Sequence, residues 1–315
     1  MRAIAMDNYG GKEVLQWREM PVPAADENEL LIRVEAAGVG VWDVLEREGF
    51  LKEMAPAAFP RIIGADGSGT VADAGKDVRD FKENDKVYGY SFLNRKGGFY
   101  AEYVVLPEEQ ISHVPDGISM IQAGALAVPG LTALHGLHSA LELQAGQRML
   151  VFGVGSVGHS AVQLAKRLKA HVFAVASGDD GVALARAAGA DYAFNGKGDE
   201  DLAGAIHEFA PGGLDGVLAT ANGKGLDSAI GAIRSGGRLA YPTGVQPEPK
   251  ARSGVDVKVF NGTPDREMYD LLNSLIEAGP FEVQVDETFR LQDAVRAQEA
   301  MEKHHLGRMV LLAGS

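Results

Sequence analysis

Three glycines near the middle of the chain have the spacing of a phosphate-binding turn. Gly153, Gly155 and Gly158 follow the apolar run at residues 149–152 and open a segment with helical periodicity. In such a turn the first glycine permits the tight bend, the second lets the backbone approach a pyrophosphate, and the third lets the helix lie close to its strand. Free N–H groups and the positive end of the helix then face the phosphates. The pattern predicts a dinucleotide site formed by Gly153, Gly155, Ser156, Val157 and Gly158.

The same spacing also occurs in glycine-rich turns of other α/β domains, so the surrounding sequence has to decide between the two interpretations. Apolar residues recur at helical spacing up to residue 168, and a second strand-like run follows at residues 171–176. Strand, turn, helix and strand in this order form a βαβ unit. This context favours dinucleotide binding.

The pattern of apolar residues changes along the chain shortly before this unit. Short strand-like runs punctuated by Gly and Pro, typical of a β-rich barrel, occupy residues 2–6, 29–35, 69–72, 86–90 and 99–105. Helical spacing follows at residues 120–127 and 131–143. Strands then alternate with helices, and we expect the strands at residues 149–152, 171–176, 191–194, 216–219 and 237–241. This alternation predicts a doubly wound parallel sheet of the α/β class.

The end of the chain does not continue the alternation. We expect a helix over 265–278, a strand over 281–285, a helix over 291–303 and a strand over 307–312. These elements are predicted to return to the first domain. The predicted domains are therefore a β-rich catalytic domain of residues 1–118 with 265–315, and a dinucleotide-binding domain of residues 119–264.

The composition excludes several function classes. Thirty Lys and Arg residues against 43 Asp and Glu give a formal net charge of −13, which disfavours nucleic acid and anionic membranes as partners. The chain contains no Cys, which excludes disulfides, a thiolate nucleophile and Cys-ligated zinc or iron–sulfur centres. No secretory signal or membrane span is recognised, so we expect a cytoplasmic protein.

The order of these parts resembles the medium-chain dehydrogenase/reductase superfamily, and more narrowly its zinc-free, zeta-crystallin-like quinone oxidoreductase group. Fragments along nearly the whole chain carry this resemblance, at residues 37–49, 63–71, 81–89, 98–103, 129–133, 153–165, 189–191 and 305–311. The resemblance implies a GroES-like barrel beside a Rossmann domain. It also implies NAD(P)H as hydride donor to a small electrophilic substrate.

One position bears on metal use. Zinc-dependent alcohol dehydrogenases of the superfamily have Gly-His-Glu where this chain has Gly64, Ala65 and Asp66. Ala65 cannot bind a metal ion, so we expect a zinc-independent enzyme without a metal site. Acceptors that react without a Lewis acid, such as quinones and α,β-unsaturated carbonyls, are favoured.

Further cofactor contacts follow from the resemblance and from the rule that ligands bind beyond the carboxyl ends of parallel strands. Thr132 is expected against the nicotinamide or its ribose, with a helix N-cap as the structural alternative. The other expected contacts are Ser177, Gly178, Asn222, Thr243, Gly244 and Arg308.

The choice between the two nicotinamide cofactors depends on the end of the second strand. No carboxylate stands there, and Ser177 with the Gly178 amide could donate to a 2′-phosphate, as in NADPH-using relatives. Asp179 and Asp180 oppose a phosphate, and many relatives have Lys or Arg near Gly181. We expect a modest preference for NADPH, with NADH also used.

Catalytic residues are less well defined. Many members of the group have Asn where Gly40 stands and Tyr where Leu45 stands, so no proton donor is identified. Asp43, Arg47 and Tyr90 remain as candidates, although Asp43 also suits a structural role as a cap. Tyr90 belongs to an aromatic set with Tyr88, Phe92 and Phe99 that suits either a pocket wall or a strand core.

Two alternatives stay open. One is a reductase or dehydrogenase of another carbonyl or enoyl substrate. The other is a non-catalytic NADPH-binding protein, which the missing Asn and Tyr side chains at Gly40 and Leu45 make credible. A separate expectation concerns assembly. Residues 254–261 alternate apolar and polar side chains and are predicted to form an edge strand that pairs across a two-fold axis, as in many members of the group. We therefore expect a homodimer.

Overall fold

The computed structural model describes residues 1–53, 58–91, 94–198 and 201–314. The chain forms two compact units, of which the first comprises Met1–Val128, Pro264–Asn273 and Val283–Ser315, and the second comprises Pro129–Thr263 and Ser274–Glu282. The first boundary falls after Val128 rather than after residue 118, because α2 (Met120–Ala123) contacts strands of the first unit. Within the described ranges no helix is long and apolar enough to cross a membrane.

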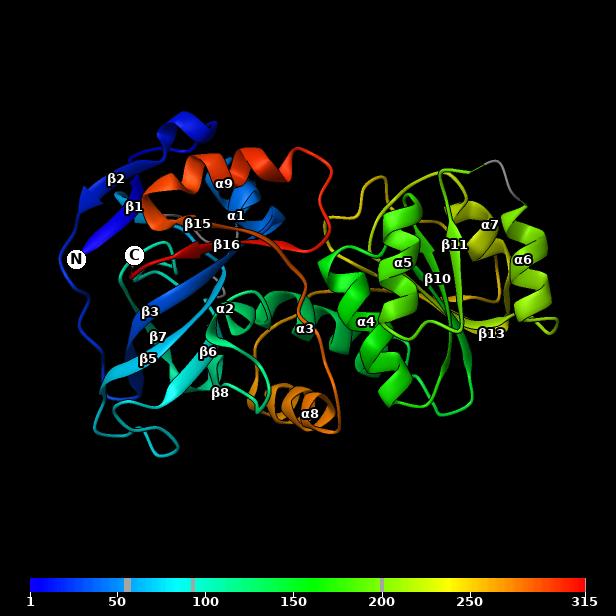
Figure 1. Cartoon of the computed structure of the whole chain (residues 1–315), viewed down its shortest axis with the longest axis horizontal. Coiled ribbons are helices and arrows are strands. Elements are labelled where there is room, and N and C mark those ends of the chain that lie inside the picture. The colour runs from blue at the N-terminus through cyan, green and yellow to red at the C-terminus, as the bar shows by residue number, and fades with distance from the viewer. Residues whose placement is uncertain (54–57, 92–93, 199–200, 315) are drawn as a thin grey trace. The chain divides into compact units, whose positions relative to one another are not determined.

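The second unit is built on a six-stranded parallel sheet (Figure 1). Its strands are β9 (Arg148–Phe152), β10 (His171–Ala176), β11 (Tyr192–Asn195), β12 (Leu214–Ala219), β13 (Ile233–Pro242) and β14 (Asp256–Phe260). They lie in the order β11-β10-β9-β12-β13-β14, so the winding direction reverses between β9 and β12. This is the doubly wound Rossmann arrangement, and it confirms the predicted fold class.

The central strands are buried on both faces, as expected for a parallel sheet covered by helices. Four residues of β9 and five of β10 are buried in succession. Helices α4 (Ser156–Arg167) and α5 (Asp179–Ala187) contact β9, β10 and β11. Side chains of α6 (Leu202–Phe209) and α7 (Leu226–Gly231) join an apolar core with Leu150, Phe152, Phe173 and Val175 of the sheet.

The first unit is mainly antiparallel. Its larger sheet runs β15-β16-β3-β5-β6-β8, with β7 also paired to β3, and a smaller sheet runs β2-β1-β4. The strands are β1 (Arg2–Met6), β2 (Gln16–Glu19), β3 (Glu29–Val39), β4 (Arg61–Ile62), β5 (Asp66–Ala74), β6 (Lys86–Tyr90), β7 (Tyr103–Pro107), β8 (Ile111–His113), β15 (Val285–Arg290) and β16 (Arg308–Leu312). The C-terminal strands β15 and β16 therefore belong to the first unit, as expected. Residues 274–282 were also expected there, but they belong to the second unit.

Several predicted elements differ from the observed ones. The strand expected at 281–285 begins only at Val285 and continues to Arg290, because the Glu282 backbone exchanges two hydrogen bonds with the Gln163 side chain, both 2.9 Å. The strand expected from residue 99 begins at Tyr103, since residues 99–101 instead bond to residues 63–64 and to β1.

The predicted helices also have different limits. The segment expected over 131–143 is α3 (Ala127–Leu134), which continues as a π-helix (His135–Ala140). Over 265–278 the observed helix is α8 (Arg266–Glu277). The helix expected over 291–303 consists of a 3-10 turn (Leu291–Asp293) and α9 (Ala294–Met301). A further short helix, α1 (Val41–Arg47), follows β3, and 3-10 turns lie at Lys12–Val14 and Glu108–Gln110.

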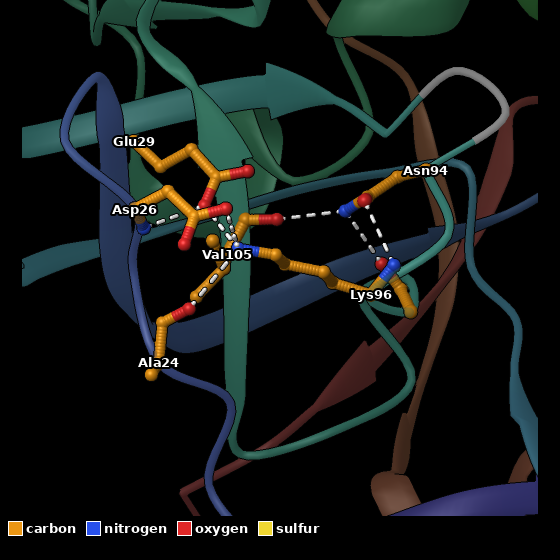
Figure 2. Close-up of polar contacts among 7 residues, drawn as sticks. Ala24, Asp26, Glu29, Asn94, Lys96 and Val105 are labelled. Atoms are coloured by element: carbon orange, nitrogen blue, oxygen red, sulfur yellow. Dashed lines mark hydrogen bonds and ion pairs between the residues drawn. The ribbon is translucent and has the colours of Figure 1, made fainter.

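A lysine ties the extended segment before β3 to a loop of the same unit. Figure 2 shows the Lys96 ammonium donating to Asp26 (2.8 Å), Glu29 (2.5 Å) and the Ala24 carbonyl (3.2 Å). The neighbouring Asn94 amide donates to the Val105 carbonyl of β7 at 2.7 Å. These contacts fix the chain leading into β3.

Candidate cofactor site and a buried charge cluster

The glycine turn follows β9 at the point where the strand order reverses. Gly153 has φ = +96°, a conformation that L side chains rarely adopt. A Cβ at Gly158 would overlap the Gly153 carbonyl oxygen, so only glycine lets α4 approach the turn. A Cβ at Gly155 would meet no atom within 4 Å. The three glycines thus have the predicted geometry, with open space at the second one.

The start of α4 leaves backbone donors for a ligand. The first helical bond runs from the His159 N–H to the Gly155 carbonyl at 2.8 Å, and no side chain of the described residues caps Gly155. The N–H groups of Ser156, Val157 and Gly158 precede that bond in the chain, where helices leave donors unsatisfied. An open backbone cradle at a helix N-terminus fits a pyrophosphate, and therefore fits the dinucleotide.

Thr220 was not predicted from the sequence, yet it fixes this turn. It directly follows β12, and its hydroxyl donates to the carbonyls of Gly153 (2.8 Å) and Phe152 (3.2 Å). Its N–H also donates to the Phe152 carbonyl, at 2.9 Å. A Thr at the end of the strand next to the glycine turn is a weak signal, because it becomes informative only once β12 is known to pair with β9.

At the end of β10 the Gly178 N–H has a different hydrogen-bond partner from the expected one. Gly178 has φ = +99°, and its N–H, expected to donate to a 2′-phosphate, donates to Asn195 Oδ1 at 3.1 Å. The Asn195 amide in turn donates to Asp179 at 2.8 Å. Ser177 is exposed. Asn195, the last residue of β11, is a second residue that sequence reasoning missed.

The remaining predicted contacts of the second unit lie in different environments. Thr132 is buried inside α3 rather than at its N-terminus, so the N-cap alternative is wrong. Asn222 follows β12 and donates to the Pro247 carbonyl at 2.8 Å. Thr243 and Gly244 follow β13 and are exposed, and the Thr243 N–H donates to the Phe260 carbonyl at 2.9 Å. Their contact with a cofactor stays a prediction.

The first unit contains a buried cluster of charges. Asp43 and Asp66 are fully buried, and Arg308 is 6% exposed. Arg308 Nη2 donates to Asp66 Oδ1 at 2.5 Å, and the Val128 N–H donates to Asp66 Oδ2 at 3.0 Å. The predicted cofactor residue Arg308 is thus engaged in an ion pair inside this unit, and its contact with a cofactor stays a prediction.

Two glycines of the β3–α1 corner make room for this arginine. A Cβ at Gly38 would clash with the Arg308 guanidinium and with Asp66, and a Cβ at Gly40 would lie 3.0–3.2 Å from three guanidinium atoms. The guanidinium therefore occupies the space beside the position where many relatives have Asn. This packing gives a structural reason for Gly40 in this chain.

Asp43 is held as a cap. Its two oxygens accept hydrogen bonds from the N–H groups of Gly40 and Ala65, each at 2.7 Å, and the Tyr100 hydroxyl donates at 3.3 Å. Burial raises the pKa of Asp43 from 3.8 to about 7, against the lowering effect of Arg308 and with a further increase from Asp66. This geometry matches the structural alternative for Asp43.

The other two catalytic candidates are also enclosed. Arg47 donates to Gln298 Oε1 at 2.9 Å and to Glu48 at 2.5 Å. Burial raises the pKa of Tyr90, which is 4% exposed. Tyr88 and Phe99 are fully buried, in line with a strand core, and Phe92 lies outside the described residues. No group of three His, Asp or Glu side chains in the described ranges is placed to hold a metal ion.

Comparisons with known proteins agree with this architecture. Residues 26–116 match the alcohol dehydrogenase GroES-like domain, and residues 156–262 match the zinc-binding dehydrogenase family. Quinone oxidoreductase from Pseudomonas aeruginosa is 31% identical, with 96% of this chain and 97% of that protein covered. Quinone oxidoreductase from Rattus norvegicus is 27% identical, with 99% and 98% covered.

Solved structures are similar over nearly the whole length. The quinone oxidoreductase from Coxiella burnetii is 29% identical (TM-score 0.84, 99% of each chain). A mycobacterial protein in complex with NADPH is 27% identical (TM-score 0.83, 99% and 100%), and an NAD-dependent alcohol dehydrogenase is 27% identical (TM-score 0.86, 100% of each chain). With its cofactor cradle, its two domain types and these relatives, the chain belongs to the quinone oxidoreductase group of the medium-chain dehydrogenase/reductase superfamily and is an oxidoreductase.

Proposed function

We propose that this enzyme transfers hydride from NADPH to a quinone or an α,β-unsaturated carbonyl without the help of zinc. The observation that carries the proposal is the glycine cradle, which is open at Gly155 and lies at the reversal of strand order. The quinone oxidoreductases among the relatives, and the NADPH complex of the mycobacterial protein, support the substrate class and the cofactor.

The chain's own residues supply binding and orientation. The bound nicotinamide contributes the hydride, and hydride chemistry belongs to the cofactor. Ser156, Val157 and Gly158 offer backbone donors to the pyrophosphate, and Thr220 keeps the turn in its binding conformation through Gly153. A turn fixed before the ligand arrives costs less ordering on binding.

The residues at the superfamily's zinc position support metal independence. Ala65 has no ligand atom, and both oxygens of Asp66 already accept hydrogen bonds from Arg308 and Val128. Tetrahedral zinc sites in enzymes need three protein ligands, typically Cys, His or carboxylate. The donor set at residues 64–66 does not fit such a site.

Activity assays with an acceptor panel test the proposal. We expect NADPH oxidation with a quinone and with an enone, at rates unchanged after exhaustive chelation. A control reaction with a saturated aldehyde tests the alternative favoured by the alcohol dehydrogenase neighbour. Loss of activity on chelation contradicts zinc independence. Cofactor binding without turnover of any acceptor would identify the protein as a non-catalytic binder.

We also propose a cytoplasmic homodimer that assembles through β14. This strand lies at the sheet edge, and Val257 and Val259 on it are 39% and 53% exposed. An exposed apolar edge strand favours pairing with a second copy across a two-fold axis. We expect sedimentation as a dimer at micromolar concentration, and as a monomer after Val259→Lys. A wild-type monomer would contradict this assembly.

A further inference from the structure

Hydrogen bonds join the turn after β10 to the turn after β11. Asn195 Oδ1 accepts from the Gly178 N–H at 3.1 Å and from the Lys197 N–H at 3.0 Å. The Gly196 N–H also donates to the Ala176 carbonyl at 2.8 Å. Residue 197 is therefore held next to the turn that ends the second strand of the Rossmann sheet.

In a Rossmann domain the residues at the carboxyl end of the second strand recognise the ribose of the adenosine. In NADPH the 2′-phosphate of that ribose therefore lies near the turn after β10. A 2′-phosphate carries nearly two negative charges and is stabilised by charge-assisted hydrogen bonds from a cation. The turn itself offers two acids, Asp179 and Asp180. Without a cation from elsewhere, this corner of the site would repel the phosphate.

Lys197 is well placed to supply that cation. Between residues 177 and 198 the basic residues are Arg186 and Lys197, and Arg186 lies in the last turn of α5, away from Gly178. Lys197 is exposed, and among the described residues its ammonium has no ion-pair partner. The two acids have local donors, since Asp179 accepts from Asn195 and Asp180 accepts from the Gly181 N–H, both at 2.8 Å.

We propose that Lys197 binds the 2′-phosphate of NADPH and so determines the cofactor preference of this chain, in a turn positioned by Asn195. The inference rests on the proposed function, because it assigns a residue to the cofactor named there. It explains how a turn with two acids accepts a phosphorylated ribose. The cation comes from the turn after β11 instead of from α5, the helix that follows Gly178.

Binding calorimetry tests this assignment without relying on activity. NADPH, NADH and the fragment adenosine 2′,5′-bisphosphate are titrated into the wild type and into Lys197→Met, which removes the charge and keeps much of the chain length. We expect NADPH and the fragment to bind about tenfold more weakly to the variant, with NADH unchanged. The difference should shrink at high salt, because an exposed ion pair is screened.

The matched control is Lys169→Met. Lys169 is also exposed, but it precedes β10 and so lies at the amino end of that strand. It should leave the affinities for all three ligands unchanged. Equal weakening of NADPH and NADH by Lys197→Met, or no weakening of NADPH, would overturn the inference while the proposed function stands. Absence of binding of either dinucleotide to the wild type would overturn both.

Discussion

The glycine turn of the second unit and the charge cluster of the first unit are built in opposite ways. The turn is a continuous stretch, Gly153 to Gly158, in which backbone N–H groups are the donors for a ligand. The space at Gly155 stays open. The cluster joins residues that lie far apart in the chain, since Arg308 follows Asp66 by 242 positions. Its carboxylates are fully buried, and each accepts hydrogen bonds from the protein itself.

This difference indicates that the turn binds a ligand and that the cluster stabilises the fold. The N–H groups at the start of α4, which no side chain of the described ranges caps, can donate to a ligand, so the turn is suited to binding. Asp43 and Asp66 already have their partners, so the cluster is suited to holding β3, β5, α1 and β16 together. Mutations should therefore affect stability in the cluster and cofactor affinity in the turn.

The largest effect is expected from breaking the buried ion pair. Arg308→Met leaves the fully buried Asp66 carboxylate without its cation, and we expect a loss of about 3–5 kcal/mol in the free energy of unfolding. Denaturant unfolding of the wild type and the variant measures it.

The double variant Asp66→Asn with Arg308→Met is the control for this loss. It removes the charge of both partners, so it should recover part of the stability lost in Arg308→Met. A single variant as stable as the wild type would show that the pair does not hold the fold. The comparison between the two regions would then fail.

The next largest effect is a pH dependence of the free energy of unfolding, which arises from Asp43 in the cluster. The pKa of Asp43 is higher in the folded protein, about 7, than its ordinary value of 3.8, because the carboxyl is buried. The folded state then binds more protons than the unfolded chain between these values. Stability from this group is fully present below about pH 4 and is lost as the pH rises to about 7.

The Asp43→Asn variant isolates that contribution, because an amide resembles the protonated carboxyl and does not titrate. We expect the wild type to lose a few kcal/mol relative to this variant between pH 4 and pH 7, at about 1.4 kcal/mol for each unit of pKa difference. Denaturant unfolding across this pH range measures the difference. A constant difference would contradict the raised pKa.

The turn and the sheet could be predicted from the sequence because their signals are local. Glycine spacing, apolar runs and alternation of strands with helices are all properties of neighbouring residues. The observed β10 covers the predicted residues 171–176, and the predicted edge strand at 254–261 contains β14. Family resemblance added the β-rich domain, and its order along the chain made the C-terminal return predictable.

The contacts that sequence reasoning missed are between strands. Thr220 holds the glycine turn from the neighbouring strand, and Asn195 holds Gly178 in the same way. The sequence suggested only that Gly40 lacks the Asn side chain of many group members. The structure shows that the guanidinium of Arg308 fills the space beside it. Such relations depend on which segments pair in space, and neither composition nor periodicity contains that information.

Calorimetric titration of NADPH into the wild type and into Gly155→Val tests the central claim most directly. A Cβ at residue 155 would meet no protein atom within 4 Å, so the variant should fold normally and lose about 100-fold or more in affinity for NADPH, because the Val side chain blocks the pyrophosphate. Gly212→Val, at another open glycine, should bind like the wild type. Unchanged affinity in a folded Gly155→Val protein would show that the glycine turn is not the cofactor site.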